Sequence, residues 1–269
     1  NIVCITFTNM ASQEMKQRLS DIPTIGDAFI GTIHSFANTI YRTSGLAYRI
    51  FSMEIQLELF KEMLSRGIGR KPKYTNLSYQ KYLKYVDLQT LYDEGKVSEE
   101  ELNSFLLPSE HDDLKEATKD MWKMCKERNI ITFNELLQKT KKYYDEIGGK
   151  LEYVLVDEFQ DVGKLEAEFI YGLNADNLFL VGDDWQSIYG FKGGDVNIFK
   201  GLLDRKDFKV YYLENNYRNC KEIVNFASGI IKQVSSKIPK NVNIMATDSN
   251  GSVKINTKGK IRDYLNEVK

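Results

Sequence analysis

Short apolar runs that alternate with stretches of helical periodicity constrain the fold of this chain most. The runs occupy residues 2–7, 153–156, 178–181 and 210–213. Each is almost continuously apolar, which is typical of parallel strands buried on both faces. Helical periodicity follows at residues 9–19 and again at residues 165–173. Because strands that alternate with helices build layered α/β domains, the sequence predicts a parallel sheet covered by helices.

A long segment between two of these runs has a different pattern. From about residue 46 to residue 149 the sequence predicts helices only, and Thr132 with Glu135 forms a capping box that marks one helix start. A second capping box, Asn219 with Glu222, predicts a helix start near the end of the chain. Since a structureless loop of this length is uncommon inside a compact domain, we expect a helical subdomain inserted into the α/β part.

Composition excludes several classes of protein. The 269 residues carry a net charge of -1, so any site for a polyanion depends on local placement of charge. The chain has three widely spaced cysteines and two histidines, which argues against a disulfide scaffold or a zinc cluster. Unpaired cysteines fit a reducing compartment, so we expect a cytoplasmic protein. No run approaches the roughly 20 apolar residues of a membrane span.

One part of the helical segment is basic and rich in tyrosine. Residues 63–86 contain no acid, and they contain Arg66, Arg70, Lys71, Lys73, Lys81 and Lys84 together with Tyr74, Tyr79, Tyr82 and Tyr85. Basic groups can neutralise phosphates and tyrosines can stack on bases, which would make this stretch a nucleic-acid contact. It can equally be a solvated helix face with tyrosines in the core, and the sequence leaves both interpretations open.

Carboxylates follow two of the apolar runs directly. Asp157 and Glu158 end the run at 153–156, and Asp183 and Asp184 follow the run at 178–181 across a glycine. Ligands of open α/β sheets bind beyond the carboxyl ends of the strands. A carboxylate there can hold Mg²⁺ on a nucleotide phosphate, and a second can orient an attacking water. Either cluster alone could be a strand that runs into a charged loop, but the two together are more informative.

Polar and aromatic residues near these clusters extend the hypothesis. Gln186 is a neutral amide that could bind a phosphate oxygen, and Tyr189 and Phe191 could face a flat partner. Tyr217 and Arg218 follow the run at 210–213, where an arginine could stabilise charge on a transferring phosphoryl group. Taken singly, each of these residues is more often structural than functional.

Five segments occur in one order that resembles a known family. They are TFTNMASQEMKQRL (6–19), GTIHSF (31–36), LVDEFQD (155–161), VGDDWQSIYGFKGGD (181–195) and LENNYRN (213–219). They resemble motifs Ia, Ib, II, III and IV of the UvrD/Rep family of superfamily 1 DNA helicases. The tryptophan of GDDWQ stands where a third aspartate is usual, which resembles the helicase IV branch.

The resemblance implies both a fold and an activity. It implies a RecA-like P-loop NTPase domain, 1A, at residues 1–45 and 150–214, a helical insertion, 1B, at 46–149, and the start of a second RecA-like domain, 2A, at 215–269. Such a protein would hydrolyse ATP with Mg²⁺ while moving 3′ to 5′ along single-stranded DNA, and would act at junctions of single- and double-stranded DNA. No membrane is implied.

The same resemblance assigns roles to individual residues. Asp157 would hold Mg²⁺ with Glu158 beside it, and Glu158 would activate the attacking water. Gln186 would sense the γ-phosphate, and Arg218 would contact that phosphate from the side of 2A. Tyr217 would stack near the adenine, and Gln160 would also lie at the nucleotide. The single-stranded DNA path would be lined by Phe7, Thr8, Asn9, Thr32, His34, Tyr189, Phe191 and Lys192.

One expected motif does not occur in these residues. The phosphate loop, GxxxxGK[ST], is absent from the sequence, although the family places it before motif Ia. We therefore expect the chain to be the middle of a helicase, to need other parts of the same polypeptide, and to hydrolyse ATP negligibly by itself. Two alternatives remain: a helicase subunit of a recombination or phage-defence helicase–nuclease, or a non-catalytic DNA-binding protein built on a helicase.

Overall fold

The chain divides into two compact units in the computed structural model. Unit 1 comprises Asn1–Val154 with Glu168–Leu178, and unit 2 comprises Leu155–Ala167 with Phe179–Lys269. The structure describes residues 1–65, 74, 77–93, 98, 100, 108–187, 194–234 and 237–245.

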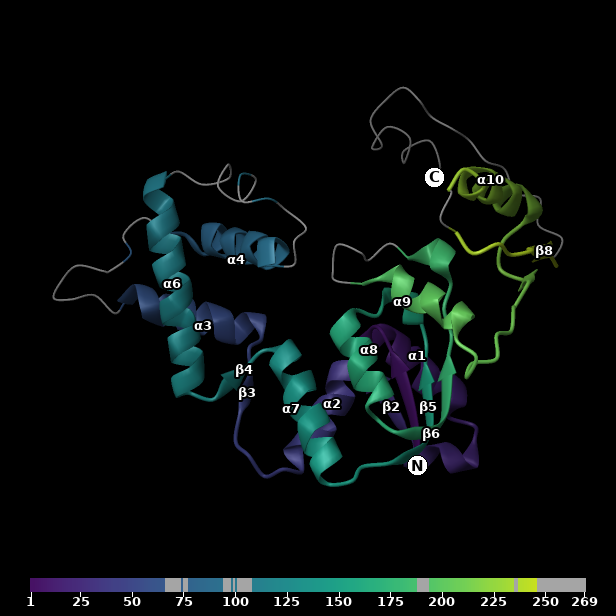
Figure 1. Cartoon of the computed structure of the whole chain (residues 1–269), viewed down its shortest axis with the longest axis horizontal. Coiled ribbons are helices and arrows are strands. Elements are labelled where there is room, and N and C mark those ends of the chain that lie inside the picture. The colour runs from purple at the N-terminus through teal and green to yellow at the C-terminus, as the bar shows by residue number, and fades with distance from the viewer. Residues whose placement is uncertain are drawn as a thin grey trace. The chain divides into compact units, whose positions relative to one another are not determined.

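A four-stranded sheet forms the α/β part, as the apolar runs predict. Its strands are β1 (Ile2–Thr6), β2 (Phe29–Thr32), β5 (Leu151–Val156) and β6 (Ala175–Leu180), in the order β2-β1-β5-β6. Helix α1 (Asn9–Leu19) connects β1 to β2, which pair in parallel, and helix α8 (Lys164–Tyr171) connects β5 to β6. Strands joined through helices in this way make the RecA-like α/β fold with a parallel sheet that we expected (Figure 1).

Burial on both faces is confirmed for β1 but not for β6. The side chains of Val3, Cys4 and Ile5 are buried, whereas Phe179 in β6 is 59% exposed. Strand β6 stands at the end of the strand order, so it has a neighbouring strand on only one side within the described sheet. This position does not by itself expose a strand, because β2 ends the order on the other side and its Ile30 is buried.

The strand predicted at residues 210–213 is wrong. These residues form no strand in the structure, and Tyr211 and Leu213 are 79% and 94% exposed. The strand pair nearest in the sequence begins two residues later, where β7 (Asn215–Asn216) pairs in parallel with β8 (Asn243–Ile244). Apolar composition produces a strand only where a neighbouring strand completes the hydrogen bonds, and no ladder of the described residues includes 210–213.

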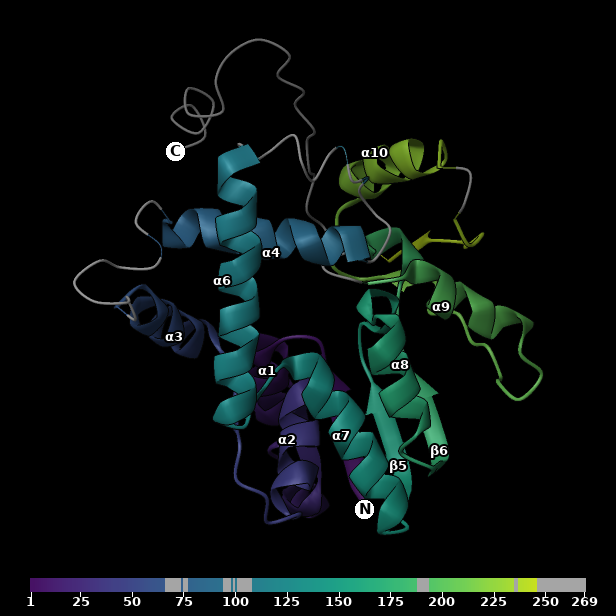
Figure 2. The ribbon, with the colours of Figure 1, turned by 60° about the vertical axis from the view of Figure 1, so that its left-hand side comes forward.

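The predicted helix boundaries hold at two sites and fail at a third. Helix α1 spans the predicted residues, and the capping box of Thr132 and Glu135 opens α7 (Phe133–Glu146). Helix α7 lies beside α2 (Ile33–Arg42) in both views, and Thr140 Oγ1 donates to Ala37 O at 3.2 Å (Figures 1 and 2). The capping box expected at Asn219 is wrong, because α10 (Lys221–Ile231) begins one residue later with Cys220 as its N-cap.

The described residues of the segment at 46–149 form mostly helices. It contains α3 (Met53–Ser65), α4 (Tyr79–Asp93) and α6 (Pro108–Glu127), with α7 following. The prediction of helices only is wrong at β3 (Arg49–Ile50) and β4 (Ile130–Ile131), which form a short parallel pair. This strand pair joins the chain just before α3 to the chain just after α6. Arg49 N donates to Asn129 O at 3.1 Å, and Phe51 N donates to Ile131 O at 2.8 Å.

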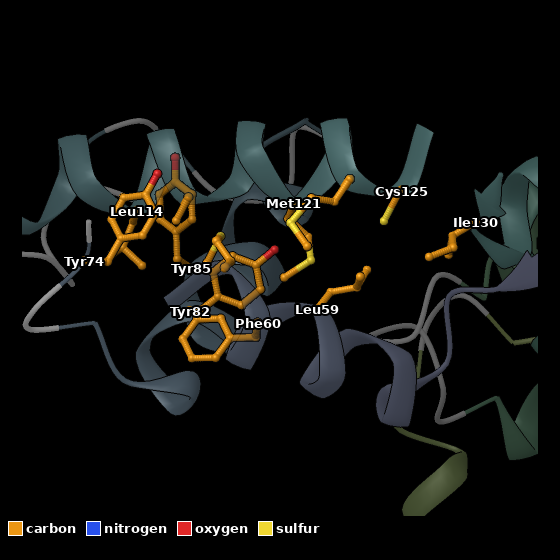
Figure 3. Close-up of a cluster of buried hydrophobic side chains, with 12 residues drawn as sticks. Leu59, Phe60, Tyr74, Tyr82, Tyr85, Leu114, Met121, Cys125 and Ile130 are labelled. Carbon is orange, nitrogen blue, oxygen red and sulfur yellow. The ribbon is translucent and has the colours of Figure 1, made fainter. Parts of the chain in front are cut away.

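The tyrosines of the basic stretch belong to a hydrophobic core. Tyr74, Tyr82 and Tyr85 are buried among residues of α3 and α6, including Leu59, Phe60, Leu114 and Met121 (Figure 3). Tyr74 Oη donates to Asp120 Oδ2 at 2.9 Å, and burial raises the pKa of Tyr82. These three rings are therefore core residues and not platforms for bases. Arg66, Arg70, Lys71 and Lys73 lie outside the described residues.

Truncation of one of these rings gives a testable effect on stability. Tyr82 is 1% exposed, so Tyr82→Ala is expected to lower the free energy of unfolding by about 3–5 kcal/mol. Lys81 precedes it on the exposed side of α4, and Lys81→Ala is expected to change stability by less than about 0.5 kcal/mol. Denaturant unfolding followed by circular dichroism measures both, and similar losses for the two variants would contradict the core assignment.

The remaining elements are short. Helix α9 (Val196–Gly201) and the 3-10 turns η2 (Phe159–Asp161), η3 (Asp184–Gln186) and η5 (Leu202–Asp204) lie in unit 2, and the turn η1 (Pro23–Asp27) lies in unit 1. None of the helices that the structure describes is long and apolar enough to cross a membrane.

Candidate functional site

The first carboxylate pair lies at the carboxyl end of β5. Asp157 and Glu158 come between the strand and η2, and Asp157 Oδ1 accepts a hydrogen bond from Glu158 N at 3.0 Å. Glu158 adopts a left-handed backbone conformation with φ 54° and ψ 40°. For a residue other than glycine this conformation costs of order 1 kcal/mol, and such strain concentrates at functional sites. The local fold thus fixes the backbone from which the Glu158 side chain projects.

The second cluster lies at the carboxyl end of the neighbouring strand. Val181 N donates to Val156 O and Phe159 N to Val181 O, both at 2.8 Å, so the two strand ends are joined. Gly182 follows, and a Cβ at this position would lie 2.7 Å from Gln160 Oε1. The glycine is needed here because the amide of Gln160 passes against the backbone. Both strand ends, from Leu155 and from Phe179 onward, belong to unit 2.

A buried glutamine joins the two clusters. Gln160 is 1% exposed, and its Nε2 donates to Glu158 Oε2 at 2.8 Å and to Asp161 Oδ2 at 3.3 Å. Its Oε1 accepts from Asp183 N at 2.9 Å. Because both ends of the amide are bonded, its orientation is determined by these partners. The amide of Gln160 therefore acts inside the protein on Glu158, and its direct contact with a nucleotide stays a prediction.

Asp161 is a buried carboxyl beside this bridge. It is 5% exposed, and its Oδ1 has no hydrogen-bond partner among the described residues. Burial raises the pKa of Asp161, the charge of Glu158 raises it further, and the hydrogen bond from Gln160 partly opposes the rise. Two carboxyls of like charge therefore lie close together at the end of β5, which is a setting in which a cation is favourable.

Asp183 is the charged centre of the second cluster. Its carboxylate accepts from Trp185 N at 3.1 Å, from Gln186 Nε2 at 2.7 Å and from Lys240 Nζ. Burial would raise the pKa of Asp183, but the hydrogen bonds from Lys240 and Gln186 outweigh it and the pKa is lowered. Gln186 itself is exposed. The sequence did not point to Lys240, because only the fold places this lysine beside Asp183, which lies 57 positions earlier.

Tyr217 and Arg218 lie in the exposed segment after β7. Asn216 Oδ1 accepts from the backbone N of Arg218 at 3.1 Å and of Asn219 at 2.9 Å, which shapes the turn. Tyr217 is 67% exposed, and its Oη accepts from Asn215 Nδ2 at 3.2 Å. Within the described part of the chain, no ion pair joins Arg218 to Asp157 or Glu158. The structure therefore does not bring Arg218 into contact with these carboxylates.

Five predicted DNA-contact residues lie in unit 1 at the edge of the sheet where β1 and β2 have their carboxyl ends. Thr6 and Thr32 are register partners at the ends of β1 and β2, so the segments that follow both strands start side by side. Thr8 Oγ1 caps α1 by accepting from Ala11 N at 3.1 Å, and Thr32 Oγ1 caps α2 by accepting from Ser35 N at 3.3 Å. The edge carries Phe7, Thr8, Asn9, Thr32 and His34. Tyr189, Phe191 and Lys192 lie outside the described residues.

The surroundings of His34 favour the neutral form of its ring. Its ring meets the ring of Phe133 edge-on with centroids 4.9 Å apart, and burial lowers the pKa of His34. Because the pKa of His34 is lower in the folded chain than in the unfolded chain, the unfolded chain binds a proton at His34 first as the pH falls. His34 therefore makes stability fall as the pH drops below about 6.5.

Replacing His34 tests this sign. We expect His34→Gln to make the melting temperature less sensitive to a change from pH 7.5 to pH 5.5 by about 1–3 °C. His111 is the other histidine of the chain, and His111→Gln serves as the control. A wild-type pH dependence in His34→Gln would show that this imidazole titrates alike in the folded and unfolded chain.

Comparison with known proteins identifies the family. The model of the UvrD/REP helicase N-terminal domain matches residues 1–209. The chain belongs to this family. It is 30% identical over 95% of its length to the ATP-dependent DNA helicase PcrA of Bacillus subtilis (strain 168), of which the match covers 36%. It is 31% identical over 95% of its length to DNA helicase II of Rickettsia typhi, of which the match covers 40%.

The relatives are much longer than this chain. DNA helicase II of Escherichia coli (strain K12) is 27% identical over 89% of the chain, and the match covers 35% of that protein. The chain thus spans little more than a third of the length of the curated relatives it matches. The resemblance stated from the sequence motifs is confirmed at the level of the family.

Proposed function

We propose that this chain is part of an ATP-driven DNA helicase that moves 3′ to 5′ along single-stranded DNA and separates strands at junctions with duplex. The names of its relatives, ATP-dependent DNA helicase PcrA and DNA helicase II, support this proposal. The observation that carries it is the joined pair of strand ends in unit 2. There Asp157 and Glu158 follow β5, and Gln160 links Glu158 to Asp183 after β6.

Magnesium fits the donor set at these strand ends. Mg²⁺ usually binds to one or two carboxylates, phosphate oxygens and several waters, and not to a cage made only of protein ligands. No cluster of three or more metal-ligating side chains occurs in the part of the chain that the structure describes. A site built from Asp157 and the adjacent Glu158 agrees with this chemistry, and the buried, unpartnered Asp161 Oδ1 adds negative potential nearby. Bound Mg²⁺ would neutralise charge on the phosphates.

Each side chain has a separate role in the proposed hydrolysis of ATP. Asp157 holds the cation, and Glu158 orients and deprotonates the water that attacks the γ-phosphate. Gln186 is exposed and hydrogen-bonded to Asp183, and on this proposal its amide exchanges that bond for one to a phosphate oxygen. Arg218 and Tyr217 approach the nucleotide from the segment after β7, the arginine at the γ-phosphate and the tyrosine at the adenine.

Single-stranded DNA is proposed to bind at the edge that follows β1 and β2. The N-termini of α1 and α2 both start there, with Thr8 and Thr32 as caps. Helix N-termini present free backbone N–H groups and favour phosphates. Phe7 and His34 add ring surfaces, and Asn9 adds an amide.

The test uses the full-length polypeptide that carries this chain. We expect ATP hydrolysis that single-stranded DNA stimulates, and unwinding of a duplex with a 3′ tail but not of one with a 5′ tail. The 269-residue chain alone is expected to hydrolyse ATP negligibly, since it has no phosphate loop. Absence of DNA-stimulated hydrolysis by the full-length protein would refute the proposal, and unwinding from a 5′ tail alone would refute the polarity.

A further inference from the structure

One lysine contacts three consecutive residues of the loop after β6. Lys240 Nζ bonds to Asp183 Oδ1, lies 2.6 Å from Asp184 Oδ1 and lies 5.1 Å from the centre of the Trp185 ring. The contact with Asp184 is an ion pair without the geometry of a hydrogen bond. The lysine side chain is 18% exposed and that of Asp184 is 1% exposed, so this pair is shielded from solvent.

Two further hydrogen bonds join the same loop to the backbone before Lys240. Asp184 Oδ2 accepts from Ile238 N at 2.7 Å, and the indole Nε1 of Trp185 donates to Ile238 O at 3.1 Å. Ile238 is buried. Both polar groups of one backbone residue are therefore taken by adjacent side chains of the loop, which fixes the register between the two segments.

These contacts continue in two directions. Toward β5, the backbone N of Asp183 donates to Gln160, whose amide donates to the Glu158 carboxylate. Toward the C-terminal side, Lys240 leads into β8, which pairs with β7 immediately before Tyr217 and Arg218. All of these residues lie in unit 2. One continuous set of contacts thus runs from Glu158 to the strand pair that presents Arg218.

We propose that Lys240, together with Asp184 and Trp185, is a positioning element that holds the loop carrying Gln186 against the segment that carries β8. This inference rests on the proposed function for its catalytic meaning. Lys240 pairs its single positive charge with the two adjacent aspartates, and the indole of Trp185 donates to the backbone of Ile238. In this way the loop that follows β6 and the β7–β8 pair keep one relative position. The positions of Glu158 and Arg218 relative to each other are fixed through the same contacts.

The contact itself is tested by fluorescence, without any activity. The chain has two tryptophans, so Trp122→Phe leaves Trp185 as the only indole. In that background, Lys240→Ala is expected to shift the Trp185 emission to longer wavelength and to increase quenching by iodide. Lys240→Arg is expected to retain most of the wild-type signal, since arginine can also bind carboxylates.

Lys237→Ala is the matched control. Lys237 Nζ binds only Lys232 O and Val234 O in the described structure, so its removal is expected to leave the Trp185 emission unchanged. An unchanged emission and quenching in Lys240→Ala would overturn the proposed contact, whatever the activity of the protein.

The positioning role is tested by kinetics in the full-length protein. Lys240→Ala is expected to lower kcat for DNA-stimulated ATP hydrolysis by about tenfold to a hundredfold, with a smaller change in KM, because displaced groups misalign the reaction. Lys240→Arg is expected to restore most of kcat, and Lys237→Ala to match wild type. A wild-type kcat in Lys240→Ala would overturn the positioning role. If the wild-type protein shows no DNA-stimulated hydrolysis, the proposed function and this role fail together, while the fluorescence result still decides the contact.

Discussion

Glu158→Gln is expected to lower DNA-stimulated ATP hydrolysis by the full-length protein by about a hundredfold to ten-thousandfold, because general-base catalysis contributes that much. The amide has the shape of the carboxylate but cannot take a proton from water. Its oxygen can still accept the hydrogen bond from Gln160 Nε2, so the strained turn is expected to keep its conformation. Steady-state turnover at saturating ATP and single-stranded DNA measures the loss.

Two comparisons separate loss of chemistry from loss of structure. ATP binding, followed with a fluorescent nucleotide, is expected to survive in Glu158→Gln because Asp157 keeps its charge and the glutamine oxygen can still act as a neutral ligand. Glu168→Gln makes the same chemical change at an exposed position of α8, and it is expected to leave turnover unchanged. Turnover within about tenfold of wild type in Glu158→Gln would exclude this residue as the base.

Lys240→Met is expected to lower the free energy of unfolding of unit 2 by about 3–5 kcal/mol, because removal of one partner leaves a buried charge uncompensated. Methionine matches the apolar stem of lysine as far as Cε and lacks the charged, donating Nζ. The Asp184 side chain, 1% exposed, is the group left without its cation. Denaturant unfolding monitored by Trp185 in the Trp122→Phe background reports on unit 2, since Trp185 lies in that unit.

The pH dependence of this loss has a definite sign. The pKa of Asp183 is lowered, with the hydrogen bond from Lys240 the largest of the lowering causes. A lowered pKa stabilises the folded state above the unfolded value, about 3.9, and this stability is lost as the pH falls below it. The difference between wild type and Lys240→Met should thus be largest near neutral pH and shrink at acid pH.

Two variants control this experiment. Lys237→Met removes a lysine of the same segment whose Nζ, among the described residues, binds two backbone carbonyls, and it is expected to cost little. Asp184→Asn added to Lys240→Met removes the stranded charge and is expected to recover part of the loss. If the double variant is as unstable as the two single losses added together, the two residues do not interact in the folded chain.

Some residues of the candidate site can be picked out from the sequence and others cannot, for a physical reason. Asp157, Glu158, Asp183 and Gln186 were singled out because strand ends followed by polar residues are visible locally. The structure places their strands side by side, and their roles stay predictions. The role of Trp185 could not be found in this way. It depends on Ile238 and Lys240, which are distant in sequence and show no motif of their own.

The same contrast applies to the tyrosines and to residues 210–213. Tyrosine beside lysine is compatible with a DNA contact or with a core, and only the packing of α3, α4 and α6 decided for the core. Residues 210–213 have a composition that favours strands, but composition cannot supply a hydrogen-bonding neighbour, and these residues are exposed.

The sequence by itself determined the alternation of strands and helices, the capped starts of α1 and α7 and the family, because these follow from local periodicity and from motifs in a fixed order. Only the tertiary structure decided how Gln160 orients Glu158, why Gly182 must lack a side chain and what Lys240 and Trp185 contact. Those contacts join residues far apart along the chain, and their partners are chosen by packing and burial, which no local pattern of the sequence encodes.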